Sequence, residues 1–419
     1  MIPGGLAIAA IFGAFAFAYF LSALLRAVTA TLAPAFSVEL GLDSADLGLL
    51  AGAYFLGFAA LQLPLGRALD RFGPRRTLLA LLAVAVLGCA AFALARGLPA
   101  LIAARALTGV GVGACLMAPL TLYRHLLEPP AQLRANSWML MTGSTGMVAS
   151  TLPVQWLLPH TGWRGLFWLL AAALALALVL IAFVVPRDRP QEATAGDPAR
   201  AGGYGAILRH PLFVSMAPLG FFVYGGLLAV QALWAGPWLT RVAGYTALQA
   251  AEGLFVVNLS MLATFLAWGA VMPRLTRRGV GAVRLMTWGL PLSLALLALN
   301  VALGGLADAG HWAAWCVACT FVTVSQPALA AAFDASHAGR ALSAFNLVIF
   351  AGVFCIQWGI GLLIDLAQDA GLDAASAMRV AFAVFGAASL LAYLWFLWRG
   401  AIDADDSVDN RCARSVHQP

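Results

Sequence analysis

The chain has 419 residues, of which 62% are hydrophobic and only 10% are charged. Soluble domains carry about 25% charged residues, so this composition excludes an ordinary soluble protein. The formal net charge is +6, and all 24 basic residues are arginine. Most of these arginines lie between apolar runs, where basic residues orient membrane proteins. We therefore predict a membrane protein in contact with a lipid bilayer and no nucleic-acid partner.

Twelve apolar runs approach the length of about 20 residues that a helix needs to cross a bilayer. The first run is too long for a cleaved signal peptide, so we predict that it is a retained span. We expect an all-α polytopic protein with spans near residues 7–33, 47–68, 77–95, 100–122, 135–158, 164–185, 211–239, 247–271, 282–304, 310–332, 341–364 and 377–399.

A polar segment rich in Pro, Gly, Arg and Asp separates the sixth run from the seventh. The sequence therefore predicts a six-helix bundle over residues 1–185, a cytoplasmic linker over 186–210, a second six-helix bundle over 211–400, and a cytoplasmic tail over 401–419. No predicted loop exceeds about 25 residues, which argues against a further domain.

The arginines predict the orientation of these spans. With the N-terminus inside, the cytoplasmic segments hold 18 arginines, the external loops hold four, and two fall within spans. Cytoplasmic loops of membrane proteins are enriched in Arg and Lys, so this distribution supports twelve spans with both termini cytoplasmic. The composition favours a bacterial source, and we expect a multi-pass protein of the bacterial inner membrane.

The two halves repeat at a constant offset. Adding 206 relates Arg71 to Arg277, Gly73 to Gly279, Arg134 to Arg340, Ala135 to Ala341 and Gly146 to Gly352. These pairs lie in the loop after the second span of each half and at the fifth span of each half. A single offset that aligns separate loops and spans indicates duplication of a six-span unit.

The loop after the second predicted span carries the most specific motif of the chain. It runs from Gly66 to Arg76 and contains Gly66, Asp70, Arg71, Gly73, Arg75 and Arg76 in the pattern G-x-x-x-D-R-x-G followed by basic residues. This pattern resembles the signature of the major facilitator superfamily. The resemblance implies two pseudo-symmetric six-helix bundles, transport by alternating access, and a latch at Asp70 that closes the cytoplasmic side while the outside is open. The second half has Thr276 in place of this acid, so we expect the latch to be asymmetric.

Two further patterns resemble the same family. Arg105 is followed by Gly109, Gly111 and Gly113 in the fourth span, and Gly162-Trp163-Arg164 opens the sixth. Small residues at such spacing let membrane helices pack closely. The fifth span, in contrast, lacks the G-P-x-x-G-G arrangement of the family's drug/proton antiporters, which makes multidrug efflux the less favoured alternative.

Two charged residues fall well inside spans: Arg26 in the first and Arg105 in the fourth. A charge inside a span usually faces protein or a water-filled cavity, and the resemblance implies that these two spans line the central cavity. No Asp or Glu falls in the middle of a span. We therefore predict that Arg26 and Arg105 bind a small organic anion or zwitterion. The alternative is that Arg105 packs against backbone carbonyls and that Arg26 extends outward to the interface.

Neutral polar side chains in the spans are the other binding candidates. Gln231 and Trp234 flank position 232, which is the offset partner of Arg26, and Gln326 lies in the tenth span. Each can instead form a hydrogen bond between helices, and the same two roles are open to other polar residues of the spans such as Tyr19, Gln62 and Asn346.

The remaining function classes lack support in the sequence. The six His are scattered, and Cys316 and Cys319 have no second pair with which to form a metal site. No phosphate-binding loop is present, so neither an enzyme nor an ATP-driven pump is expected, and we predict no metal or cofactor. The prediction is a secondary transporter, with a non-transporting receptor or assembly protein as the alternative from another class. We expect a monomer that binds a small-molecule substrate; a coupling proton or ion stays open, with Asp365 and Glu252 at external span ends as titratable groups.

Overall fold

The computed structural model describes residues 5–188 and 204–400. Within these ranges the chain forms helices and no strand. The predicted linker lies partly outside the described residues, and the predicted tail over 401–419 lies wholly outside them. The boundaries of the linker and of the two bundles therefore stay predictions.

The first half of the chain contributes seven helical segments. They are α1 (Gly5–Leu40), α2 (Ser44–Phe72), α3 (Pro74–Leu94), α4 (Leu98–Val112), α5 (Met117–Leu126), α6 (Pro129–Ala149) and α7 (Leu152–Val184).

The second half is more often interrupted, with π and 3-10 segments (η) between its α-helices. Its segments are α8 (Gly205–Leu208), α9 (Pro211–Pro218), η2 (Leu219–Tyr224), α10 (Gly225–Ala229), η3 (Val230–Trp234), α11 (Ala235–Arg241), α12 (Ala247–Arg277), α13 (Ala282–Leu303), η4 (Gly304–Leu306), α14 (Ala309–Cys319), η5 (Thr320–Val324), α15 (Ser325–Ala331), α16 (Ala335–Asp369) and α17 (Ala374–Trp398).

The predicted all-α polytopic architecture is confirmed. Eleven helical stretches of the described residues are long and apolar enough to cross a membrane, and α7 is counted among them as one. However, α7 is divided at Gly162, whose backbone is not helical (φ 63, ψ 171). The part after Gly162 is the sixth span, and the part before it extends α6 into the fifth. With α6, which is not among these eleven stretches, the helices account for twelve spans.

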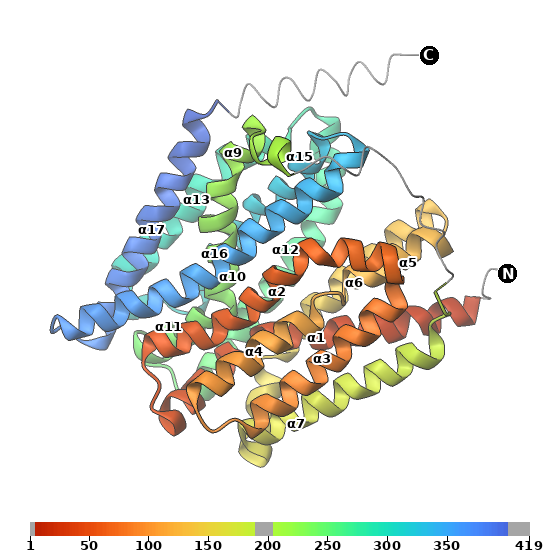
Figure 1. The fold of residues 1–419 in the computed structure, drawn as a ribbon. Coiled ribbons are helices and arrows are strands. Elements are labelled where there is room, and N and C mark those ends of the chain that lie inside the picture. Colours follow the sequence, from red (N-terminus) through yellow and green to blue (C-terminus); the bar gives the residue numbers. More distant parts are fainter. Residues whose placement is uncertain (1–4, 189–203, 401–419) are drawn as a thin grey trace.

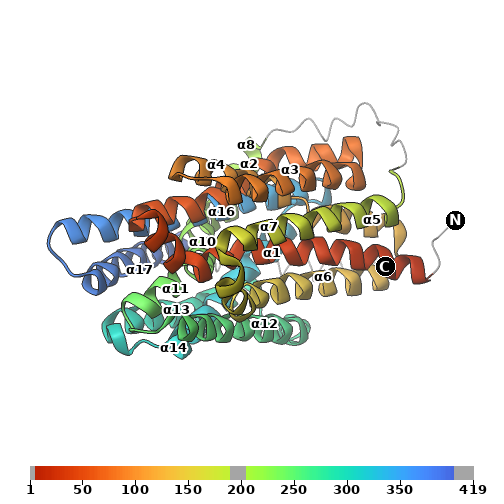
Figure 2. The same cartoon turned by 90° about the horizontal axis from the view of Figure 1, so that it is seen from below.

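The helices form two groups that follow the two halves of the sequence (Figure 1). α1 to α7 lie together, with α1 running beside α6 and α7 (Figure 2). α9 to α17 form the second group, and the two groups meet most extensively where α2 crosses α16. Because the number of spans is even, the first and the last span begin and end on the same face of the protein. We call the end with Gly5 and Gly400 the terminal face, and the opposite end, which includes the turns at 41–43 and 370–373, the distal face.

Equivalent glycines perform equivalent roles in the two halves. A Cβ at Gly146 would collide with the carbonyl oxygen of Phe20, so this glycine lets the fifth span lie against α1. Gly352, its partner at the offset of 206 residues, lies in the same way against the carbonyl of Phe221. Close backbone contact of this kind is how membrane helices associate without a hydrophobic driving force. The internal repeat thus reappears as matched packing of the first span on the fifth and the seventh on the eleventh.

Three spans depart from regular α-helix near the middle of the molecule. The fourth has a turn over 113–116 between α4 and α5, the seventh contains the π segments η2 and η3, and the tenth contains the 3-10 segment η5. Irregular backbone at membrane depth is tolerated where it is buried in protein or lines a cavity. These interruptions therefore point to a functional region between the halves.

Candidate functional site

A cavity of about 370 Å³ lies between the two halves. Its volume falls in the range of about 300–1,000 Å³ that is usual for small-molecule sites. Both halves contribute to its lining, which consists of Tyr19, Ser22, Arg26, Phe58, Gln62, Val112, Gly113, Leu116, Met117, Leu140, Tyr224, Gln326, Pro327, Ala330, Leu342, Asn346 and Phe350.

The interrupted spans reach this cavity at their irregular points. Gly113 and Leu116 belong to the turn between α4 and α5, Tyr224 ends η2, and Gln326 follows η5 by two residues. The cavity extends toward the terminal face, because Leu342 lies near the start of α16 and Ala330 near the end of α15. The helix interruptions and the cavity thus coincide.

Arg26 provides the one formal charge of the lining, which contains no carboxylate. Its guanidinium carbon lies 5.6 Å from the centroid of the Phe58 ring. The Nε atom is buried and has no hydrogen-bond partner. The guanidinium also interacts with the hydroxyl of Tyr54, but no carboxylate of the lining balances its charge. A cation in a partly enclosed space is costly unless an anion or water completes its hydrogen bonds. The first-half wall is therefore suited to a negatively charged group.

The second-half wall is neutral. Gln326 Nε2 donates to Asn346 Oδ1 at 2.6 Å, which joins α15 to α16 at the edge of the cavity. Phe350 on α16 contacts Phe58 on α2 at a centroid distance of 4.6 Å. This ring pair crosses the interface between the halves. It gives the cavity an apolar surface beside Arg26, against which the carbon skeleton of a ligand can pack.

Arg105 is placed differently from Arg26. It is 1% exposed and does not belong to the lining of the cavity. Its Nη2 donates to the carbonyl oxygen of Leu25 at 2.7 Å and to Thr29 Oγ1 at 2.6 Å. Its guanidinium carbon lies 4.9 Å from the centroid of the Tyr54 ring. These are the contacts of the packing alternative, in which the arginine joins α4 to α1 and α2.

Gln231 and Trp234 also lie away from the cavity lining. Gln231 Nε2 donates to Asn258 Oδ1 at 3.0 Å, and Trp234 Nε1 donates to the carbonyl oxygen of Gln357 at 3.1 Å. All these side chains are buried. Of the five predicted binding residues, the structure thus brings Arg26 and Gln326 to the cavity and leaves Arg105, Gln231 and Trp234 in helix contacts.

Five polar residues of the lining were not in the predicted binding set: Tyr19, Ser22, Gln62, Tyr224 and Asn346. All of them had a signal in the sequence as polar side chains within predicted spans, including Tyr224, which lies in the span 211–239 as Tyr19 lies in the span 7–33. The place of Tyr224 at the end of η2 is what periodicity does not reveal.

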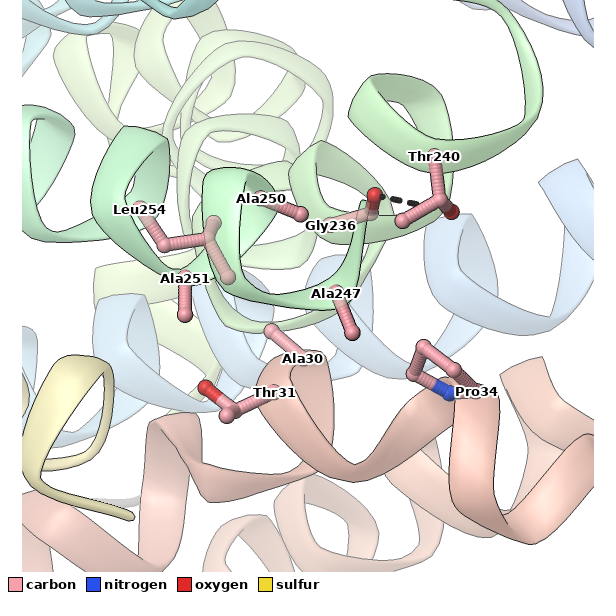
Figure 3. Close-up of a pocket in the computed structure, with 9 residues that line it drawn as sticks. All are labelled: Ala30, Thr31, Pro34, Gly236, Thr240, Ala247, Ala250, Ala251 and Leu254. Atoms are coloured by element: carbon pink, nitrogen blue, oxygen red, sulfur yellow. Dashed lines mark hydrogen bonds between the residues drawn. The ribbon is translucent and has the colours of Figure 1, made fainter. Parts of the chain in front are cut away.

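The distal side of the cavity is closed by small residues. Ala30, Thr31 and Pro34 of α1 face Gly236 and Thr240 of α11 and Ala247, Ala250, Ala251 and Leu254 of α12 (Figure 3). The space left between these helices is about 10 Å³, which is roughly the room for one water molecule. No small-molecule substrate fits there.

The α2–α16 crossing closes the same side. A Cβ at Gly48 would collide with the carbonyl oxygen of Gln357, and one at Gly361 with that of Ser44. Three hydrogen bonds join the halves here: Ser44 N and Ala45 N donate to the carboxylate of Asp365, and Arg241 donates to Ser44 Oγ.

The loop motif over Gly66–Arg76 lies at the terminal face and bonds within its own half. The backbone N–H groups of Arg75 and Arg76 donate to the carboxylate of Asp188 at 3.1 and 2.8 Å. Gly73 has φ 84, and a Cβ there would collide with Asp188. Asp70 is exposed, and the described residues offer it no hydrogen bond or ion pair.

The family motif of the sixth span also has a structural counterpart. Trp163 Nε1 donates to Glu39 Oε2 at 2.5 Å, and Arg164 forms an ion pair with Glu39. These contacts join the start of the sixth span to the end of α1 at the distal face. Within residues 5–188 and 204–400, no group of three or more His, Cys, Asp or Glu side chains is placed to hold a metal ion.

Comparison with known proteins gives a consistent family. The model of the Major Facilitator Superfamily matches residues 15–323. The multidrug resistance protein MdtL of Escherichia coli O81 is 27% identical over 169 residues, which is 40% of this chain and 43% of MdtL. The match therefore spans less than half the length of this curated relative.

Solved structures match nearly the whole chain. A bacterial homolog of the human lysosomal transporter Spinster, crystallised in an inward-facing and unoccupied conformation, has a TM-score of 0.74 at 17% identity, covering 96% of this chain and 99% of that one. A D-xylose-proton symporter has a TM-score of 0.71 at 16% identity, covering 93% of this chain and 97% of that one. At such identities these likenesses establish the fold.

Proposed function

The chain belongs to the major facilitator superfamily, and we propose that it is a secondary transporter that moves a small organic anion or zwitterion by alternating access. The observation that carries this proposal is the cavity of about 370 Å³ between the halves, in which Arg26 is the one formal charge of the lining. A site with an unpaired cation and no carboxylate favours a substrate that supplies the negative charge.

The contacts around the cavity support a model in which different residues bind different parts of the substrate. Arg26 offers a planar, permanently charged fork for a carboxylate or phosphate. Phe58 and Phe350 offer an apolar surface, and Gln326 and Asn346 can exchange their mutual hydrogen bond for one to the substrate. We propose that Arg105, Gln231 and Trp234 support the walls of this site through their helix contacts and do not touch the substrate.

We also propose an orientation. Cytoplasmic loops are enriched in arginine, so the terminal face, with the motif over Gly66–Arg76, is placed in the cytoplasm of a bacterium and the distal face outside its inner membrane. The cavity then extends toward the cytoplasm while the outer side is closed. The unpartnered state of Asp70 agrees with an inward-facing conformation, because the latch of the family would be engaged in the opposite one. We propose that the transporter acts as a monomer without nucleic acid.

Efflux of hydrophobic or drug-like compounds is the second candidate function. It is favoured by the 27% identity to MdtL over 169 residues. The fifth span lacks the antiporter motif, and the cavity lining lacks the carboxylate that would bind a cationic drug. An anionic cargo is therefore our leading proposal for either direction of transport.

Purified protein in liposomes tests the proposal. Radiolabelled organic anions, zwitterions and cations would be assayed for uptake, with and without a pH gradient, beside the Arg26→Gln variant. Arg96→Gln is the matched control, since Arg96 is exposed in the loop between α3 and α4. We expect anion or zwitterion uptake that Arg26→Gln abolishes and Arg96→Gln retains. Transport of cations alone would show that the proposed anionic or zwitterionic substrate is wrong. Transport of no compound in a broad panel would count against a transport function.

A further inference from the structure

Two tyrosines, one from each half, line the cavity beside Arg26. Tyr19 of α1 and Tyr224 of η2 both interact electrostatically with the Arg26 guanidinium. Tyr19 is 8% exposed, and neither hydroxyl has a hydrogen-bond partner among residues 5–188 and 204–400. Buried polar groups of folded proteins are normally bonded. This end of the cavity therefore offers a guanidinium and two phenolic O–H donors to one ligand group.

Close helix packing fixes the place of both tyrosines. A Cβ at Gly143 of α6 would lie 2.5 Å from the Tyr19 ring and 2.9 Å from its hydroxyl oxygen, so this glycine provides the space that the side chain occupies. Tyr224 directly precedes Gly225, where a Cβ would lie 3.0 Å from backbone atoms of Gly352 on α16. The two hydroxyls are thus held at the cavity by the contacts of their helices.

These three side chains suit one carboxylate. A carboxylate has two oxygens that accept several hydrogen bonds, and its bonds with a guanidinium or a hydroxyl are short and strong. Arg26 is the one formal charge of the lining, so a second anionic group would have no cation there. An ammonium group would have no carboxylate, and burial of an unpaired charge is costly.

The rest of the cavity is mainly apolar. Phe58 and Phe350 contact each other across the interface, with ring centroids 4.6 Å apart. Gln62 Nε2 donates to the carbonyl oxygen of Phe58 at 3.3 Å within its own helix. Gln326 and Asn346 bond to each other, so they offer one hydrogen bond for exchange. A polyhydroxylated ligand would lose hydrogen bonds to water that these walls do not replace.

We propose that the substrate is a monocarboxylate with an apolar, ring-sized body and no ammonium group, and that its carboxylate bonds to Arg26, Tyr19 and Tyr224. This inference rests on the proposed transport function and narrows it, because it excludes zwitterions and sugar acids as good substrates. The body packs against Phe58 and Phe350. Since Tyr224 belongs to the second half, the bound carboxylate joins the two halves.

The test compares ligands that differ in one group. Binding to the purified protein in detergent is measured by calorimetry at about pH 7, where a carboxylate is ionised. Hydrocinnamate is the probe. Phenylalanine adds an ammonium group to the same skeleton, phenylpropylamine has a cation in place of the carboxylate, and gluconate keeps the carboxylate on a polyhydroxylated body.

We expect hydrocinnamate to bind about tenfold or more tightly than phenylalanine, because the site leaves the ammonium group unpaired. Gluconate and phenylpropylamine should show no binding at the same concentrations. Equal or tighter binding of phenylalanine or gluconate overturns the proposal, and so does the absence of binding by every probe.

Tyr19→Phe and Tyr224→Phe each remove one hydroxyl and keep the ring, so the packing is retained. Loss of a hydrogen bond to a charged group should raise the Kd of hydrocinnamate about tenfold in each variant. Tyr123→Phe is the matched control, because the Tyr123 hydroxyl is also buried without a partner but lies outside the lining. It should leave the Kd unchanged. An unchanged Kd in both Tyr19→Phe and Tyr224→Phe overturns the carboxylate site.

The liposome assay of the proposed function separates the two claims. Uptake of phenylalanine or gluconate without binding of hydrocinnamate overturns the narrower substrate class and leaves transport of anions or zwitterions in place. Binding and uptake of phenylpropylamine alone overturn both.

Discussion

The two walls of the central cavity differ in chemistry although they belong to halves that repeat at an offset of 206 residues. The wall from the first half carries Arg26, whose buried Nε has no partner. The wall from the second half carries Gln326 and Asn346, which satisfy each other at 2.6 Å. Position 232, the offset partner of Arg26, is an alanine. The two halves thus share the packing of Gly146 and Gly352, whereas their cavity walls differ, with charge in one half and neutral hydrogen bonding in the other.

A second contrast lies within the first half. Arg26 and Arg105 both fall within spans and looked alike in the sequence. The structure gives Arg105 two oxygen partners and an aromatic neighbour, whereas Arg26 faces the cavity. Access is what separates them: Arg105 is 1% exposed, with Nη2 bonded and Nε and Nη1 enclosed without partners, whereas Arg26 lines the cavity, where a ligand can reach it.

Charge reversal at Arg26 should have the largest effect on transport. Arg26→Glu replaces the proposed anion partner by a like charge, so we expect uptake of the anionic substrate to fall about a hundredfold or more. Arg26→Lys keeps the charge but loses the planar fork, and should retain measurable uptake. Initial rates in proteoliposomes measure both. Wild-type rates in folded Arg26→Glu protein would remove Arg26 from the site.

Arg105→Gln should instead reduce stability. Its removal leaves the acceptors at Leu25 and Thr29 without their charged donor, and we expect the free energy of unfolding to fall by about 1.5–3 kcal/mol. Thermal unfolding in detergent measures this, with Arg124→Gln on exposed α5 surface as the control. Transport per folded molecule should change little. A stable Arg105→Gln protein without transport would instead assign Arg105 to the substrate.

Truncation of the neutral wall should have a smaller effect. Asn346→Ala removes the partner of Gln326, and we expect the KM for the substrate to rise about three- to tenfold, the effect of one neutral hydrogen bond. Ser343→Ala, one turn earlier on α16 and outside the lining, is the control. An effect as large as that of Arg26→Glu would show that the two walls contribute equally to substrate binding.

Gln231→Ala should have the smallest effect. Hydrogen bonds between membrane helices contribute about 0.6 kcal/mol on average, so loss of the bond to Asn258 should lower the unfolding temperature slightly. We expect unchanged uptake kinetics. A specific rise in KM would contradict the placement of Gln231 away from the substrate.

Much of the architecture could be predicted from the sequence, because run length and loop arginines are physical requirements of a membrane span. The predicted break between residues 158 and 164 falls at Gly162, and Gly146 and Gly352 pack as their offset implies. The candidate site was less predictable. The depth of an arginine in a span does not reveal whether its neighbours offer oxygen atoms, so Arg26 and Arg105 could not be distinguished.

Irregular helix geometry accompanies the other differences between the predicted and the observed placement of the site residues. Gln231 and Trp234 lie within η3, and Tyr224 lies in η2. A π segment rotates the following residues relative to a regular helix. Gln231 and Trp234 were predicted from their place beside position 232, and that place does not indicate that their side chains bond to Asn258 and to the carbonyl oxygen of Gln357. Similarly, the bonds of Asp365 to α2 join residues separated by 321 and 320 positions, which no local pattern indicates.

Ligand-induced stabilisation tests the central claim most directly, namely that Arg26 binds an anionic substrate in the cavity between the halves. Thermal unfolding of the purified wild type, Arg26→Gln and Arg96→Gln would be recorded with increasing concentrations of the transported anion. A ligand at a hundred times its Kd stabilises the folded state by about 2.7 kcal/mol. We predict this stabilisation for the wild type and Arg96→Gln and its absence for Arg26→Gln. Equal stabilisation of all three proteins would contradict the account.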